Sequence, residues 1–238
     1  MRRRFFVDAF DADRAVLTGE AAHHLGRVLR AEPGQLYELS DGTSVRLGKI
    51  EFSGRDRVEF SLLEPIPVYV SHIHKTLLLA VVKFDRFEWA IEKATELGVD
   101  RIVPLAAARS EKGLLNGVGK RVERWKKIVF EASQQSRRLR LPVIEEMATP
   151  KAAFTNKDAG LQVMLSEQAG AQPLRQVLQG QHVDRVMLAI GPEGGWTDAE
   201  FSDANDAGFR EASLGNLILR TETAVTACFA AVNYALEA

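Results

Sequence analysis

The sequence has little of several features that mark particular classes of protein. Cys228 is the only cysteine in 238 residues, which excludes a disulfide framework and a cysteine-based metal site. No apolar run approaches the roughly 20 residues that a membrane-spanning helix needs. The basic residues near the N-terminus are not followed by the apolar segment of a secretion signal. We therefore expect a cytoplasmic protein that uses no membrane and no metal.

An excess of charge of either sign is also missing overall, since 31 Lys and Arg stand against 32 Asp and Glu. The distribution is uneven, however. Residues 120–140 hold eight Lys or Arg and two Glu, a net charge of +6, whereas residues 141–213 hold five Lys or Arg and eleven Asp or Glu. A basic stripe on a neutral protein is typical of binding to a polyanion such as RNA. On charge alone, a solvated helix face is an equally good interpretation.

The pattern of apolar residues changes near residue 70. Before it, a helical segment at 20–30 and short strands with turn residues between them (36–42, 45–54 and 57–65) predict a small β-barrel-like domain over residues 1–70. After it, strand-like runs (75–83, 101–107, 161–167 and 185–191) alternate with helical segments (84–100, 120–135, 197–208 and 221–238). This alternation predicts an α/β domain over residues 71–238 with a mostly parallel sheet.

The stretch "IGPEGG" (190–195) lies between a predicted strand and a predicted helix. Thr197 and Glu200 fit a capping box, so the helix begins directly after the loop, where open α/β sheets bind ligands. Phosphate fits poorly, because the loop has neither a Walker Lys-Ser/Thr nor Gly-x-Gly-x-x-Gly spacing. Glu193 would also repel an anion. The loop therefore favours a neutral or cationic ligand; alternatively, its glycines only form a tight turn.

A second stretch, "LGNLILRTETA" (214–224), repeats this arrangement of a small loop and a helix that begins near Thr221. Leucine and isoleucine side chains stand there beside Arg220, Thr221, Glu222 and Thr223. Two loops of backbone and leucine side chains are suited to enclose a flat aromatic base. The arginine and the carboxylates would then stand near a reacting centre.

These two stretches together resemble the C-terminal motifs of the knotted SPOUT methyltransferases, and within them the bacterial 16S ribosomal RNA uridine-N3 methyltransferases. Other stretches agree: "RRFFV" (3–7), "HHLGRVLR" (23–30), "IEKATELGVDRIVPL" (91–105), "ARS" (108–110) and "RWKKIVFEASQQSRR" (124–138). The resemblance spans nearly the whole chain. It implies a C-terminal SPOUT-type α/β domain with a mostly parallel sheet and a trefoil knot, and a small N-terminal PUA-like β-barrel that binds RNA. It also implies S-adenosylmethionine as cofactor and a homodimer.

The chemistry implied by this resemblance assigns roles to three side chains. A uracil N3 carries a proton, and this nitrogen is a poor nucleophile until the proton is removed. Arg220 would donate hydrogen bonds to a uracil carbonyl and favour the anionic ring. Glu222 or Glu193 would accept the proton, directly or through water. The alternative for Arg220 is a structural ion pair with Glu222.

The expected binding residues form two groups. The cofactor contacts lie on three loops: Leu165, Ser166 and Glu167; Ile190, Gly191, Gly194 and Gly195; and Leu214, Gly215, Leu217 and Leu219. For any single leucine, plain core packing is an equally good interpretation. The RNA contacts are basic and lie in the small domain and in the basic segment: Arg2, Arg3, Arg4, Arg27 and Arg30; and Lys126, Lys127, Arg137 and Arg138. Such residues position phosphates without specifying sequence.

The sequence therefore predicts an S-adenosylmethionine-dependent enzyme that methylates N3 of a uridine in 16S rRNA of the small ribosomal subunit. Two alternatives stay open. One is a SPOUT enzyme that methylates a ribose 2′-hydroxyl, since this acceptor also needs activation. The other is a non-catalytic RNA-binding module with a vestigial pocket, which the intact glycine and leucine loops disfavour.

Overall fold

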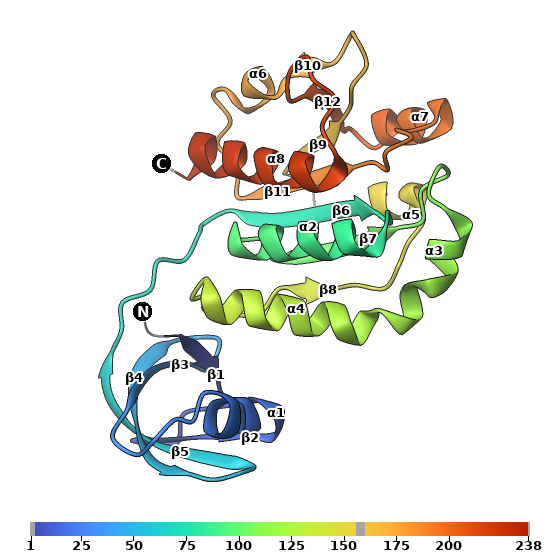
Figure 1. Ribbon diagram of the computed structural model, residues 1–238. Helices are drawn as coiled ribbons and strands as arrows, with labels where there is room; N and C mark the ends of the chain where they lie inside the picture. Colours follow the sequence, from blue (N-terminus) through green and yellow to red (C-terminus); the bar gives the residue numbers. More distant parts are fainter. Residues whose placement is uncertain (1–2, 156–159, 238) are drawn as a thin grey trace. The chain divides into compact units, whose positions relative to one another are not determined.

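The computed structural model describes residues 3–155 and 160–237. The chain forms two compact units, residues 1–70 with 133–141, and residues 71–132 with 142–238 (Figure 1). The division of the sequence into domains at residue 70 stays our proposal. Residues 133–141, which the sequence placed in the second domain, group with the first unit. One contact that joins this segment to the first unit is the hydrogen bond that the Ser40 hydroxyl donates to the Leu139 carbonyl at 2.5 Å.

The first unit is a five-stranded sheet with strand order β1-β3-β4-β5-β2. The strands are β1 (Arg4–Phe6), β2 (Arg14–Thr18), β3 (Leu36–Ser40), β4 (Val45–Ser53) and β5 (Arg57–Pro65). The three strands predicted from turn signals are confirmed as β3, β4 and β5. The single helix predicted over 20–30 is instead α1 (Gly19–His23) followed by a π-helical turn (His24–Val28). Phe5, Leu39, Ile50 and Phe60 form the centre of its core.

The second unit contains a seven-stranded sheet with strand order β10-β12-β9-β11-β6-β7-β8, in which every pairing is parallel. The strands are β6 (His74–Ala80), β7 (Arg101–Leu105), β8 (Val143–Ile144), β9 (Leu161–Leu165), β10 (Gln172–Pro173), β11 (Arg185–Ile190) and β12 (Arg210–Ser213). The helices are α2 (Phe84–Glu96), α3 (Lys112–Gly117), α4 (Val122–Gln135), α5 (Pro150–Phe154), α6 (Leu174–Leu178), α7 (Asp198–Asp206) and α8 (Thr221–Leu236).

The central strands of this sheet are buried on both faces, as the continuous apolar runs predicted. All five residues of β9 and the last five of β11 are buried. One face packs against α2, α4, α6 and α8, and the other against α5 and α7 (Figure 1). The predicted fold class, a mostly parallel α/β domain with a separate small β domain, is confirmed. The trefoil knot stays a prediction. Within the described residues, no helix has the length and apolarity to cross a membrane.

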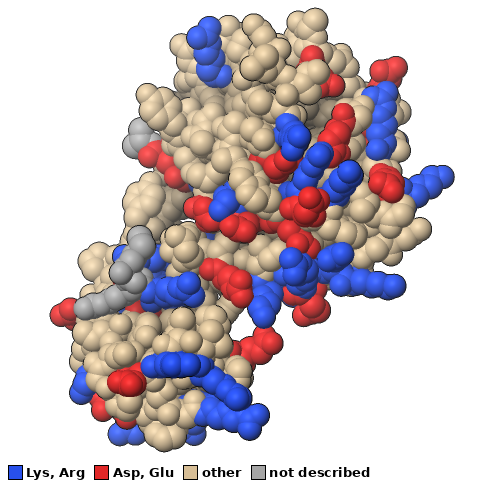
Figure 2. Space-filling model, viewed as in Figure 1, with Lys and Arg blue, Asp and Glu red and all other residues tan. Residues whose placement is uncertain are grey.

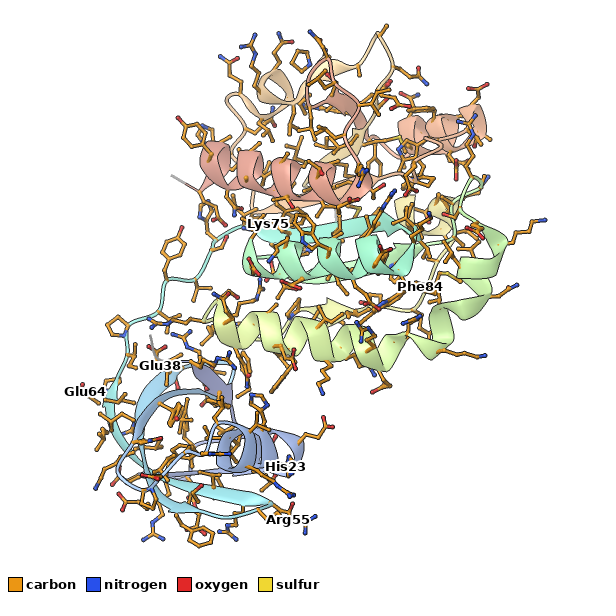
Figure 3. All side chains as sticks on the ribbon, viewed as in Figure 1. His23, Glu38, Arg55, Glu64, Lys75 and Phe84 are labelled. Atoms are coloured by element: carbon orange, nitrogen blue, oxygen red, sulfur yellow. The ribbon has the colours of Figure 1, made fainter. Side chains whose placement is uncertain are left out.

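A buried lysine ties the last turn of α8 to the sheet. Lys75, labelled in Figure 3 where β6 begins, has a side chain that is 1% exposed. Its Nζ atom lies 2.5 Å from Glu237 Oε1 and 2.8 Å from Asn233 Oδ1. Asn233 in turn donates a hydrogen bond to the Leu97 carbonyl at the end of α2. Burial raises the pKa of Glu237, but hydrogen bonds from Lys75 and Ser71 outweigh it, so this pKa lies below its ordinary value of 4.5.

This lowered pKa predicts a pH-dependent stability. A carboxylate with a depressed pKa stabilises the folded state above the ordinary pKa, and this contribution is lost as the pH falls through the folded-state pKa. We expect Glu237→Gln to lower the urea midpoint at pH 7 and to have a much smaller effect at pH 3. Urea unfolding at both pH values measures this, with Glu59→Gln at the exposed Arg57–Glu59 pair as the control. An equal effect of Glu237→Gln at both pH values would show that the charge of Glu237 does not contribute.

Candidate active site

A pocket of about 390 Å³ opens where three adjacent parallel strands end. β9, β11 and β12 end at residues 165, 190 and 213, and the loops that follow them line the pocket together with the first turn of α8. The carboxyl ends of parallel strands meet at one edge of a sheet, and open α/β sheets bind ligands at this edge. The pocket therefore lies where the two sequence motifs place it.

The β11–α7 loop (residues 191–197) has a defined conformation. Gly195 has a φ of +70°, in the left-handed region that favours glycine. Thr197 and Glu200 form the predicted capping box, in which Glu200 Oε2 accepts a hydrogen bond from the Thr197 backbone N–H at 2.8 Å. Trp196 is buried, and its Nε1 donates to the Leu165 carbonyl at 3.0 Å. The last contact joins this loop to the end of β9.

The β12–α8 loop (residues 214–220) forms the opposite wall of the pocket. Leu217 and Ile218 are 82% and 80% exposed, which is unusual for large apolar side chains. The Thr221 hydroxyl donates a hydrogen bond to the Gly191 carbonyl at 3.3 Å. The two loops that the sequence singled out therefore meet at one site.

Four charged side chains line this pocket: Arg109, Glu167, Glu193 and Arg220. The Arg109 guanidinium donates a hydrogen bond from Nη1 to the Gly194 carbonyl at 2.6 Å. Glu193 forms an ion pair with Arg86, with 2.6 Å between Oε1 and Nη1. Over residues 3–155 and 160–237, no ion pair joins Arg220 to Glu222, so the structure does not favour the structural alternative for Arg220.

The structure brings most of the predicted site residues to this pocket. All the predicted cofactor residues except Gly194 line it: Leu165, Ser166, Glu167, Ile190, Gly191, Gly195, Leu214, Gly215, Leu217 and Leu219. Gly194 lies in the same loop with its carbonyl bound to Arg109. Of the predicted catalytic residues, Arg220 and Glu193 line the pocket. Glu222 does not; its Oε2 atom is buried without a hydrogen-bond partner in the described part of the chain.

Two family models match this chain. The family model "RNA methyltransferase domain" matches residues 70–233, and "RNA methyltransferase PUA domain" matches residues 17–63. This chain belongs to the RNA methyltransferase family. Ribosomal RNA small subunit methyltransferase E of Synechocystis sp. is 35% identical over 93% of this chain and 73% of its own length. The protein of the same name from Mycobacterium bovis is 32% identical over 96% and 90%.

Two solved structures resemble this RNA methyltransferase throughout. Ribosomal RNA small subunit methyltransferase E from Neisseria gonorrhoeae, bound to S-adenosylmethionine, has a TM-score of 0.88 and 27% identity, and covers 99% of this chain and 98% of that one. A Legionella pneumophila protein in complex with the same cofactor has the same values.

The residues of the pocket fit S-adenosylmethionine. The volume lies within the range of about 300–1,000 Å³ typical of small-molecule sites. Leu165, Ile190 and the leucines of the β12–α8 loop would provide apolar contacts for an adenine ring. Glu167 would suit the cationic groups of the cofactor, whereas Glu193 is already paired with Arg86. The RNA methyltransferase domain therefore has a donor set that suits this cofactor.

The predicted RNA-binding residues differ from one another in their exposure to solvent. Arg27, Arg30, Lys126 and Lys127 are exposed, although Lys126 pairs with Glu123 at 2.8 Å. Acidic side chains lie among the cations over α2 and α4 (Figure 2), so the basic segment is partly neutralised. Arg3 is exposed, Arg138 is half-buried, and Arg2 lies outside the described residues.

Arg4, one of the predicted RNA contacts, is buried in the first unit. It is 4% exposed, and its Nη2 lies 2.9 Å from Glu38 Oε2. Its Nη1 also donates to the Arg137 carbonyl. Arg137 is half-buried, with its own Nη1 3.5 Å from Glu38 Oε1. Figure 3 labels Glu38, the carboxylate that these two arginines share. Two ion pairs with the buried carboxylate of Glu38 hold these arginines in the first unit, which a count of basic residues does not reveal.

Two residues of the site were not among those assigned to cofactor binding or catalysis from the sequence. Arg109, for which its place at a strand end suggested a supporting or RNA-binding role, lines the pocket and binds the glycine loop. Arg86 follows β6 and carried no signal of its own, because an arginine in the first turn of an amphipathic helix is ordinary. Knowledge of the strand order would have found both, since β6 lies beside β11 in the sheet and β7 lies beside β6.

Proposed function

We propose that this protein transfers the methyl group of S-adenosylmethionine to N3 of a uridine in 16S rRNA of the small ribosomal subunit. The observation that carries the proposal is the meeting of the two motif loops at a pocket with Arg220 in its wall. The relatives named above are small-subunit rRNA methyltransferases, which supports this class of substrate. The uridine-N3 specificity rests on the resemblance of the motifs in residues 190–195 and 214–224.

When bound, the cofactor supplies an electrophilic methyl group on a positively charged sulfur. The part of the protein in this reaction is to align the two reactants and to exclude water. The apolar side chains and backbone of the β11–α7 and β12–α8 loops hold the adenosyl group, which fixes the position of the reacting carbon. Leu217 and Ile218 stand exposed at the pocket and would be covered by the RNA.

The uracil that accepts the methyl group must lose its N3 proton, and charged side chains assist this step. Arg220 donates hydrogen bonds to a uracil carbonyl and so stabilises the ring that has lost its N3 proton. Of the two predicted proton acceptors, Glu193 already pairs with Arg86, whereas Glu222 Oε2 has no hydrogen-bond partner in the regions described. We therefore assign the proton to Glu222, and because Glu222 does not line the pocket, the transfer would pass through a water molecule. Exposed Arg27, Arg30 and Lys127 hold RNA phosphates, which gives a steep dependence on salt.

We propose further that the protein acts as a homodimer in the cytoplasm. Tyr234, on α8, is 91% exposed, and Trp89, on α2, is 43% exposed. Large aromatic side chains at the surface are typical of residues that a partner covers. Sedimentation equilibrium distinguishes a dimer from the 26.3 kDa monomer, and a monomer at micromolar concentration would contradict this assignment.

The reaction is tested by mass spectrometry of 16S rRNA nucleosides from a strain that lacks this gene. We expect 3-methyluridine to disappear and to return with the wild-type gene but not with Arg220→Ala. The Arg210→Ala gene is the control, because Arg210 is exposed at the start of β12, at the opposite end of that strand from the pocket. Loss of a 2′-O-methylated nucleoside in place of 3-methyluridine would identify the other acceptor.

A further inference from the structure

The β11–α7 loop is held by two arginines that come from neighbouring strands. Arg86, in the first turn of α2 after β6, places Nη1 2.6 Å from Glu193 Oε1. Arg109, in the segment after β7, donates from Nη1 to the Gly194 carbonyl at 2.6 Å. β6 pairs with β11, and β7 pairs with β6. Consecutive residues of one loop are thus bound from the carboxyl ends of two other strands.

Glu200 adds a third connection to the same loop. Its buried carboxylate closes the capping box through Oε2, and its Oε1 accepts a hydrogen bond from the Ala108 backbone N–H at 2.8 Å. The residue before Arg109 is therefore fixed to the start of α7. Gly195 allows the turn of this loop, since its φ of +70° lies in the left-handed region that favours glycine.

We propose that Arg86 and Arg109 are positioning residues for the cofactor loop and that Glu193 is the anchor of Arg86, not a proton acceptor. A loop that is already fixed in its binding conformation loses less conformational freedom when it binds a ligand, which strengthens affinity. Protonation of Glu193 would remove the charge from a 2.6 Å hydrogen bond to Arg86, so the pair opposes a role in proton transfer. The inference rests on the proposed function only in that this loop binds the cofactor.

The test is the affinity for S-adenosylhomocysteine, measured by calorimetry without RNA. We expect Arg86→Gln and Arg109→Gln each to weaken binding about tenfold, because hydrogen bonds to charged groups contribute this much. Glu193→Gln should weaken it by a similar factor. Arg86→Glu and Glu193→Arg should each weaken binding more, and the double variant with both changes should recover most of the loss, since it restores the pair in reverse.

The matched control is Arg101→Gln. Arg101 pairs with Glu145 at 3.1 Å, and the side chains are 28% and 42% exposed, against 26% and 40% for Arg86 and Glu193. It begins β7, at the amino end of the strand, so its loss should leave the affinity unchanged. Thermal melting of each variant separates a change in the loop from unfolding of the protein.

Three outcomes decide between the possibilities. Wild-type affinity in folded Arg86→Gln and Arg109→Gln would show that these residues do not position the loop. A kcat of Glu193→Gln that is lower by about 10²-fold or more at saturating cofactor and RNA, with unchanged affinity, would make Glu193 the proton acceptor and overturn the inference. If the wild-type protein itself does not bind S-adenosylhomocysteine, the proposed function fails, independently of the role of these arginines.

Discussion

Replacement of Arg220 by alanine is expected to lower kcat by about 10²- to 10³-fold and to leave the affinity for S-adenosylhomocysteine nearly unchanged. Removal of one hydrogen-bond donor that stabilises a developing anion typically costs this much. Arg220 lies directly before α8, lines the pocket, and is exposed. Its guanidinium is therefore available to a docked base. Single-turnover methylation of 16S rRNA at saturating cofactor, together with calorimetry, measures the two quantities separately.

Two further variants make this test specific. Arg220→Lys keeps the positive charge but loses the planar pair of donors, so we expect it to recover only part of the rate. Arg210→Ala removes an exposed arginine of the same domain away from the pocket and should leave kcat unchanged. Equal losses of kcat and of cofactor affinity in Arg220→Ala would assign Arg220 to cofactor binding and not to the acceptor.

Local patterns in the sequence were sufficient for several of the elements around the pocket. The apolar runs of β6, β9 and β11 are buried on both faces, which is the environment such runs indicate. The capping box of Thr197 and Glu200 fixed the start of α7 to the residue, because its two side chains lie within one helical turn. Each of these features depends on residues that are close in the chain.

Features that depend on distant residues were not predictable in the same way. β12 reads Arg-Glu-Ala-Ser, which has no apolar run, and it is a strand because it pairs with the buried β9. Arg4 looks like part of a basic N-terminus until the fold brings Glu38 to it. The pair of Arg86 and Glu193 joins residues that are 107 positions apart. Such contacts follow from strand order, and strand order is not encoded in periodicity.

A side chain at position 191 is expected to abolish most of the cofactor binding. A Cβ on Gly191 would lie 3.0 Å from Trp196 Cε2 and 3.1 Å from its Nε1. The indole cannot retreat, because it is 5% exposed and its Nε1 is bound to the Leu165 carbonyl. The backbone at 191 must move instead. The Gly191 carbonyl accepts the hydrogen bond from the Thr221 hydroxyl, so a shift of the backbone at 191 displaces both loops of the pocket.

We therefore expect Gly191→Val to weaken S-adenosylhomocysteine binding about a hundredfold, since overpacking costs roughly 1–3 kcal/mol and each 1.4 kcal/mol is a factor of ten. Gly191→Ala, with a smaller side chain, should lose about tenfold and serves if the valine variant does not fold. Gly119→Val is the control, because a Cβ there meets nothing within 4 Å. Calorimetry of the three folded variants measures the effect. Wild-type affinity in Gly191→Val would contradict a cofactor site at this loop.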